Sequence, residues 1–240
     1  MIVAGINFAS HFMVLHTRSF APYARDSEAR YFIMVIGVSV IGISTLLYVE
    51  NVYPDLLTAV RYAAFNIVSV GTTTGYATAD YNLWPVFAPL WILFLGTFLS
   101  CSGSTGGGIK MMRAMILYRQ VYREIKGLAH PHAVNPVKVA GQVVADSVVF
   151  AVLGFFFIWV VLLVTMTLIL GWTGLDAMTA FSAVVASLNN IGPGLHQVGP
   201  ATNFAVLTDF QTWVCAFAML LGRLELFALL VVFTPTFWRK

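Results

Sequence analysis

The sequence predicts an all-α membrane protein. Of its 240 residues, 59% are hydrophobic and only 10% are charged, whereas about 25% are charged in an average soluble domain. Two uncharged stretches, residues 81–109 and 147–175, are each 29 residues long, and about 20 residues suffice to cross a bilayer. Together with a mean hydropathy of +0.85, this composition excludes a secreted disulfide domain, a nucleic-acid binder and a Rossmann enzyme.

The first half of the chain predicts membrane segments of unequal length. Residues 1–15 are apolar, and the first basic residue, Arg18, follows this run, which is the reverse of the order in a signal peptide. We therefore expect residues 1–17 to be the tail of a preceding transmembrane helix, with further segments upstream. Residues 31–49 predict a full span, and residues 55–70 predict a helix that is too short to cross alone.

A glycine-rich break interrupts the next apolar stretch. Residues 83–100 are apolar, residues 101–108 are rich in glycine and serine, and a basic helix is expected from Ile109. Each of the four glycines in this break would cost a helix up to about 1 kcal/mol relative to alanine, so we expect an intramembrane loop. The remainder predicts a span, a short helix, a polar loop and a long interrupted helix, at residues 148–170, 175–188, 189–194 and 204–238.

Charge asymmetry predicts the orientation of these segments. Eleven of the thirteen basic residues fall on one side of the predicted topology, and the positive-inside rule makes that side cytoplasmic. The other side has Arg61 as its only basic residue and holds five acidic residues, Glu50, Asp55, Asp80, Asp176 and Asp209. We therefore expect the C-terminus to be cytoplasmic and both short helices, with the polar loops that follow them, to face outward.

A repeat relates the two halves of the chain. Tyr31 precedes Gly75 by 44 residues, and Val148 precedes Gly192 by 44 residues. Each unit has a span, a short helix, a polar loop and a second span in the same orientation, which is typical of a cation-channel subunit. Many secondary transporters use inverted repeats instead.

The two polar loops, residues 71–76 and 189–194, are candidate pore linings. Non-helical backbone at membrane depth is tolerated only inside protein or against water. Each loop follows a helix C-terminus, whose partial negative charge attracts a cation, and carbonyls aimed by glycine can replace a hydration shell. An ordinary turn between two helices is the alternative. Asn189 and Asn190 could line the filter through their side-chain oxygens or brace it from behind.

The glycine-rich segment, residues 103–108, superficially resembles a phosphate-binding loop. Ile109 stands where that motif requires lysine, and no soluble strand precedes the segment, so we reject a nucleotide site. Two interpretations stay open, namely a kink that lets helices pack closely and a gate below the filter.

Arg223 is the expected partner of this loop. It follows Gly192 by 31 residues, just as Gly106 follows Gly75, so the repeat predicts a similar depth for both. Glu225 points off another helix face, whereas carbonyls of the loop can accept hydrogen bonds from the guanidinium. Snorkelling of Arg223 toward the cytoplasmic interface is the alternative.

These motifs resemble the Trk/Ktr potassium-transport family, and specifically its TrkH-type membrane subunit. The residues that carry the resemblance are 69–76, 103–110 and 187–195, and it extends along the whole chain. It implies a potassium-channel-like fold in which four repeats on one polypeptide surround one pore, with Gly75 and Gly192 as the filter glycines of the last two. The implied domains are the tail of repeat two, repeat three and repeat four, at residues 1–17, 18–127 and 128–240.

The resemblance also implies the function and partners. Potassium is the expected substrate, no covalently bound cofactor is expected, and the chain is not expected to be an enzyme. The implied partners are membrane lipid, the N-terminal repeats of the same subunit, a second copy in a homodimer, and a cytosolic TrkA-type nucleotide-binding regulatory subunit. No nucleic acid is expected, and the implied location is a bacterial-type cytoplasmic membrane.

We expect two groups of functional residues. The candidate filter residues are Thr72, Thr73, Thr74, Gly75, Tyr76, Asn189, Asn190, Ile191, Gly192, Pro193 and Gly194. The candidate gate residues are Gly103, Ser104, Thr105, Gly106, Gly107, Gly108, Lys110 and Arg223. One alternative function is an alternating-access symporter coupled to sodium or protons. A remote alternative is an intramembrane serine hydrolase using Ser102 or Ser104, although the GxSxG motif is missing.

Overall fold

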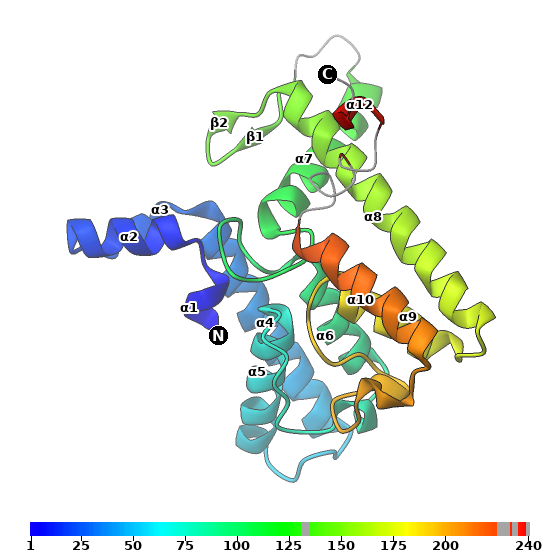
Figure 1. The fold of residues 1–240 in the computed structure, drawn as a ribbon. Helices are drawn as coiled ribbons and strands as arrows, with labels where there is room; N and C mark the ends of the chain where they lie inside the picture. The colour runs from blue at the N-terminus through cyan, green and yellow to red at the C-terminus, as the bar shows by residue number, and fades with distance from the viewer. Residues whose placement is uncertain (131–134, 225–230, 232–234, 239–240) are drawn as a thin grey trace.

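The chain folds mainly into helices (Figure 1). The computed structural model describes residues 1–240 except 131–134, 225–230, 232–234 and 239–240. In this described part, α4 (Ser27–Val49) and α8 (Asp146–Trp172) are the two helices that are long and apolar enough to cross a membrane. They confirm the spans predicted at residues 31–49 and 148–170, and each begins before the predicted start.

The first unit consists of α4, α5 and α6. The short helix α5 (Leu56–Gly71) packs against α4 on one side and against α6 (Phe87–Phe98) on the other. It begins at Asp55, whose carboxylate accepts a hydrogen bond from the Leu57 backbone N–H at 2.9 Å. Such a cap satisfies N–H groups that have no partner within the helix.

The second crossing of this unit is a helix broken at the glycine-rich loop, as predicted, but its first part begins at Phe87 rather than at residue 83. Trp84 is extended, with φ −78° and ψ 162°, as expected for a residue that precedes a proline. α6 has 12 residues and therefore rises about 18 Å, less than the ~30 Å hydrocarbon core. After the glycine-rich loop, the chain continues in α7 (Met111–Ala129).

The second unit repeats this order with α8, α9 and α10. The short helix α9 (Ala177–Leu188) packs between α8 and α10 (Asp209–Arg223). The predicted helix over residues 204–238 was wrong at its start, because Thr208 and Gln211 form a capping box that begins α10 at Asp209. α10 ends at Arg223 and α12 (Pro235–Trp238) is a separate short helix; Glu225 lies outside the described residues.

The N-terminal segment also differs from the prediction of one continuous helix tail. α1 (Ile2–Gly5) and α2 (Phe8–Thr17) are separate helices, because the Asn7 side chain accepts the Ala9 N–H at 2.8 Å and caps a new helix. α3 (Ala21–Arg25) then leads into α4.

A β-hairpin, which the sequence did not predict, separates the two units. Its strands are β1 (Lys138–Val139) and β2 (Gln142–Val143), which pair antiparallel. Ala140 and Gly141 both have positive φ, 50° and 81°, as a two-residue hairpin turn requires. The loops that follow α5 and α9 contain three short 3-10 turns, η1 (Tyr81–Leu83), η2 (His196–Val198) and η3 (Phe204–Val206).

Two buried apolar clusters hold the helices together, and the first of them also includes residues of α8 and α9. One buried cluster is centred on α4, α5 and α6, and includes Phe32, Ile67 and Leu95. The other is centred on α8, α9 and α10, and includes Leu170 and Leu221. Figure 1 shows the two bundles side by side, with the C-terminal ends of α5 and α9 toward the centre of the molecule. The structure therefore confirms the predicted fold of two consecutive helical repeats.

Candidate ion pathway

The two short helices end in the same hydrogen-bonded turn. The Thr72 N–H donates to the Val68 carbonyl at 3.0 Å, and 117 residues later the Asn189 N–H donates to the Val185 carbonyl at 3.1 Å. The side chains repeat the match: Thr72 Oγ1 and Asn189 Nδ2 each donate to the same carbonyl as their own N–H, both at 2.7 Å. The repeat inferred from sequence spacing therefore extends to individual backbone bonds.

The next residues of both loops follow the same backbone path. Thr73 and Asn190 both have φ 53°, a left-handed conformation that costs a β-branched residue such as threonine about 1–3 kcal/mol. Gly75 and Gly192 follow with φ 85° and 113°. Because glycine adopts positive φ without a steric penalty, it is the residue that suits both positions.

The two loops meet at their glycines. A Cβ atom on Gly75 would overlap the Ile191 carbonyl oxygen and lie 3.5 Å from Gly192 Cα. A Cβ atom on Gly192 would lie 3.3 Å from Gly75 Cα. The loops that end α5 and α9 are therefore in direct backbone contact at the positions that the sequence singled out.

The asparagine side chains point away from this contact. Asn189 is fully buried, and its amide donates back into α9. Asn190 Nδ2 donates to the Met219 carbonyl of α10 at 3.1 Å. Both side-chain amides therefore donate to helix carbonyls rather than to the other loop. Asn189 Oδ1 is buried without a hydrogen-bond partner among the described residues.

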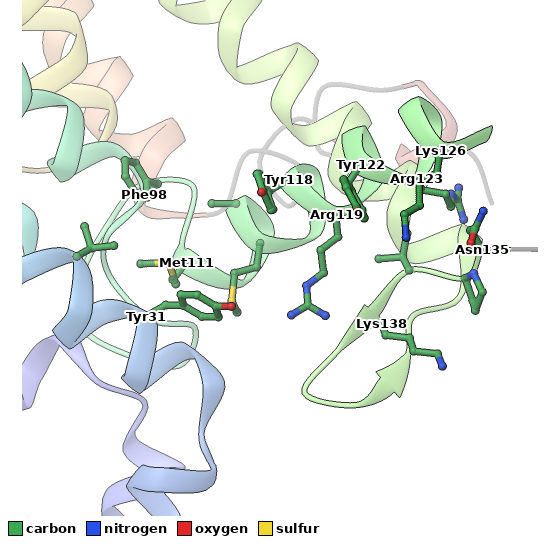
Figure 2. Close-up of a pocket in the computed structure, with 15 residues that line it drawn as sticks. Tyr31, Phe98, Met111, Tyr118, Arg119, Tyr122, Arg123, Lys126, Asn135 and Lys138 are labelled. Carbon is green, nitrogen blue, oxygen red and sulfur yellow. The ribbon is translucent and has the colours of Figure 1, made fainter. Parts of the chain in front are cut away.

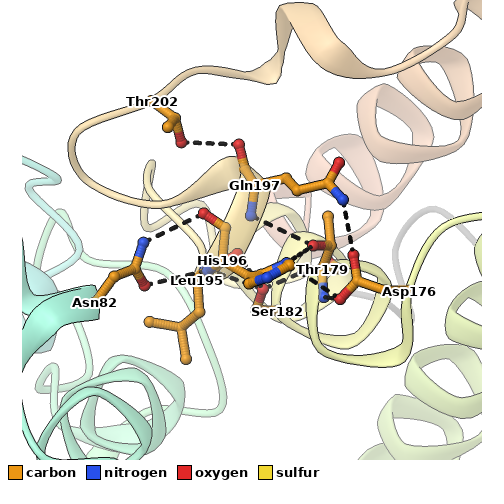
Figure 3. Close-up of polar contacts among 8 residues, drawn as sticks. All are labelled: Asn82, Asp176, Thr179, Ser182, Leu195, His196, Gln197 and Thr202. Carbon is orange, nitrogen blue, oxygen red and sulfur yellow. Dashed lines mark hydrogen bonds and ion pairs between the residues drawn. The ribbon is translucent and has the colours of Figure 1, made fainter.

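Further polar contacts hold the segments that follow the two turns. Asn66 Oδ1 accepts the Thr78 N–H at 3.3 Å, and Ser182 Oγ accepts the Leu195 N–H at 2.9 Å. Asn82 links the two units, because it donates to the His196 carbonyl at 3.2 Å and accepts its N–H at 3.1 Å (Figure 3). Sequence reasoning missed Asn82, which no local pattern distinguishes from other loop residues.

An anchoring cluster fixes the helix that precedes the second loop. His196 Nδ1 lies 3.0 Å from Thr179 Oγ1 and 3.3 Å from the Asp176 carboxylate (Figure 3). Burial raises the pKa of Asp176, but hydrogen bonds from Thr179 and the nearby His196 outweigh it, so this pKa lies below its usual value.

The glycine-rich loop lies against the inner ends of both short helices. The Gly107 N–H donates to Thr73 Oγ1 at 2.9 Å. A Cβ atom on Gly107 would overlap the Asn189 carbonyl oxygen and lie 2.9 Å from its carbonyl carbon. A Cβ atom on Gly108 would overlap the Thr97 carbonyl oxygen. Glycine is required here because the loop passes within backbone contact of the turn that ends α9 and of the C-terminal end of α6.

Two charged side chains hold this loop from opposite sides. Arg223 Nη1 donates to the Thr105 carbonyl at 2.9 Å, which is the loop contact that the repeat spacing predicted. Glu28, buried at the start of α4, accepts the Ser102 N–H at 3.0 Å. Sequence reasoning missed Glu28; the available signal was an acidic residue just before an apolar span.

The loop also bonds to the N-terminal segment. The Cys101 N–H donates to the Gly5 carbonyl at 3.0 Å, and the Thr105 N–H donates to the Ala4 carbonyl at 3.3 Å.

A cavity of about 200 Å³ lies beside the loop and is lined by Lys110, Arg113 and Arg223 among others. Lys110 Nζ bonds to the Gly106 carbonyl within the loop.

Some predicted site residues lie apart from the contact between the loops. Tyr76 is 71% exposed, and the Gly194 N–H donates to the Val198 carbonyl of η2 at 2.8 Å. Most of the remaining predicted residues lie in the two turns or in the glycine-rich loop, whereas Lys110 lies at the start of α7 and Arg223 at the end of α10. In the described part of the chain, no group of His, Cys, Asp and Glu side chains could hold a metal ion.

Two membrane-length helices, two short helices that end in matched turns, and a glycine loop across their inner ends define a channel-like membrane transport fold. Comparisons with known proteins give the particular family. The chain belongs to the TrkH family of cation transport proteins, whose family model matches residues 1–240.

Relatives of known function resemble the chain over its whole length. It is 41% identical over 240 residues to the Trk system potassium uptake protein TrkH of Salmonella typhimurium, and 35% identical over 239 residues to TrkG of Escherichia coli K12. Each comparison covers 100% of this chain and 49% of the relative. The chain therefore spans about half the length of these relatives.

A solved structure matches the fold. The crystal structure of the potassium transporter TrkH from Vibrio parahaemolyticus superposes with a TM-score of 0.93 at 40% sequence identity, covering 99% of this chain and 51% of that chain.

Proposed function

We propose that this chain supplies two of the walls of a potassium pathway, with residues 72–76 and 189–193 as filter segments. The observation that carries the proposal is the pair of identical turns, 117 residues apart, that meet at Gly75 and Gly192. The partial negative charges at the C-termini of α5 and α9 favour a cation there. Backbone carbonyls can replace the hydration shell of potassium, and neither segment contains a carboxylate.

The names of the relatives support potassium as the ion, since those proteins are named potassium uptake proteins. We further propose that the filter faces outward and the basic loops face the cytoplasm, in a bacterial-type cytoplasmic membrane. A homodimer and a TrkA-type nucleotide-binding subunit are the proposed partners; the relatives' designation as a Trk system supports an assembly of several components.

The glycine-rich loop is the proposed gate. It lies at the inner ends of both filter turns, where the Gly107 N–H bonds to Thr73. Arg223 holds the loop through the Thr105 carbonyl and adds a positive charge that opposes passage of a cation. Movement of the loop away from the filter would remove both the loop and the Arg223 charge from the proposed ion path.

The filter assignment is tested in the full-length protein that contains this chain, expressed in a potassium-deficient host. Gly75→Ser and Gly192→Ser should each lower the permeability of potassium relative to sodium. The matched control is Gly174→Ser, because Gly174 also has positive φ (96°) but has open space around it. Unaltered relative permeability in both filter variants, at normal expression, would reject the assignment.

The gate is tested by Arg223→Ala, with Arg223→Lys as the charge-conserving control. Loss of the hydrogen bond and the charge should raise rubidium uptake, and lysine should restore much of the block. Equal or lower uptake in Arg223→Ala would contradict the gating role. Uptake that requires a sodium or proton gradient would instead favour the symporter.

A further inference from the structure

A large groove on the inner side of the molecule has no role in the ion pathway. It encloses about 870 Å³ between α4, α7 and the segment that leads into β1 (Figure 2). This volume is within the usual range for small-molecule sites, about 300–1,000 Å³.

One end of the groove is basic. Arg119, Arg123 and Lys126 line it from successive turns of α7, and Lys138 lines it from β1. Figure 2 shows the Arg119 guanidinium extending from α7 toward the space between α4 and the hairpin. The Arg119 side chain forms no hydrogen bond or ion pair with the described residues, whereas Arg123 bonds to Asp146 at 2.6 Å. The Arg119 guanidinium therefore places a positive charge, without a paired carboxylate in the described part of the chain, on the wall of the groove.

The other end of the groove is apolar. Tyr31 and Val35 line it from the first turns of α4, a helix of membrane-crossing length, and Phe98 and Met115 complete the wall. In the proposed membrane orientation, this end lies where the hydrocarbon region begins, and the basic end lies at the level of the lipid head groups. Aromatic and basic residues gather at that level in membrane proteins.

We propose that this groove binds an anionic phospholipid of the inner leaflet. The phosphate would accept hydrogen bonds from Arg119, and an acyl chain would lie along Val35 and Phe98. The charge pattern selects the ligand, because basic pockets between membrane helices on the cytoplasmic side suit anionic head groups. A zwitterionic lipid would leave the positive charge of Arg119 without a net counter-charge.

The inference does not rest on the proposed transport function, so its test measures lipid and not ion flux. The full-length protein is extracted from membranes of phosphatidylglycerol, cardiolipin and phosphatidylethanolamine, and retained lipid is quantified by native mass spectrometry. Arg119→Gln should reduce retained phosphatidylglycerol or cardiolipin by about fivefold, the effect expected of one basic residue near an anionic surface. Arg119→Lys should retain most of the lipid.

Two further variants control for net charge. Arg25→Gln makes the same charge change at an exposed position on α3 outside the groove, and should leave retention unchanged. Asp146→Asn frees Arg123 from its ion pair, so it should raise retention. Equal losses in Arg119→Gln and Arg25→Gln, or equal retention of phosphatidylethanolamine, would overturn the proposal.

Crosslinking identifies what occupies the groove in the membrane. A photoreactive benzoylphenylalanine in place of Tyr118, which lines the groove and is 75% exposed, should crosslink to phospholipid. Crosslinking to another protein, to a second copy or to another segment of the same polypeptide would contradict a lipid site.

Discussion

Replacement of Gly107 by alanine tests how tightly the glycine loop is held against the filter turns. The new Cβ would overlap the Asn189 carbonyl oxygen and lie 2.9 Å from its carbonyl carbon. Both atoms are backbone at the end of α9, so they cannot move aside as a flexible side chain would. The loop must therefore shift, which also breaks the 2.9 Å hydrogen bond from the Gly107 N–H to Thr73 Oγ1.

The expected cost is the sum of these two effects. Overpacking a tight site costs about 1–3 kcal/mol, and the lost hydrogen bond costs about 1 kcal/mol. Gly107→Ala should therefore lower the free energy of unfolding by about 2–4 kcal/mol. The matched control, Gly127→Ala on α7, has nothing within 4 Å of the new Cβ, so its higher helix propensity should stabilise the protein by up to about 1 kcal/mol.

The assay is unfolding of the full-length protein in mixed detergent micelles, followed by tryptophan fluorescence. Thr73→Val measures the hydrogen bond separately and should cost about 1 kcal/mol. In the double variant of Gly107 and Thr73, the combined cost should fall short of the sum by about the same amount, because the displaced loop has already lost that bond. Equal stability of Gly107→Ala and Gly127→Ala, or strict additivity, would refute the proposed contact.

Two further predictions concern the carboxylates of Glu28 and Asp176. Glu28→Ala should lower the free energy of unfolding by about 1–3 kcal/mol, because it leaves the Ser102 N–H without its acceptor. Glu28→Gln should recover most of this lost stability. Equal losses of the two variants in chemical unfolding would contradict the prediction. Since the pKa of Asp176 is lower in the folded protein than its usual value of 3.8, its stabilisation is present above that pH and is lost as the pH falls through the lowered pKa. Asp176→Asn should remove this part of the acid dependence of the melting temperature, and an unchanged acid profile would show that Thr179 and His196 do not stabilise the carboxylate.

The internal repeat allowed one contact between distant residues to be predicted from sequence spacing alone. The 31-residue interval from each filter glycine placed Arg223 at the level of the glycine loop, and its bond to the Thr105 carbonyl is present. This worked because two copies of one unit share a backbone path, so equal sequence distances give equal depths. The same reasoning could not find Glu28 or Asn82, because their partners lie 74 and 114 residues away with no matching pair in the other unit.

The sequence by itself determined the properties that depend on local chemistry. Apolar runs defined the two spans, the first short helix was placed from Asp55, and the glycines at positions 75 and 192 indicated turns with positive φ. Hydropathy, helix capping and glycine conformation act over a few residues, so they can be read without the fold.

Only the tertiary structure decided the contacts between distant segments. It brought Gly75 against Gly192 and Gly107 against the end of α9, and it opened the basic groove beside α4. These features depend on which backbones approach one another, and that is fixed by the packing of whole helices rather than by any short pattern of residues.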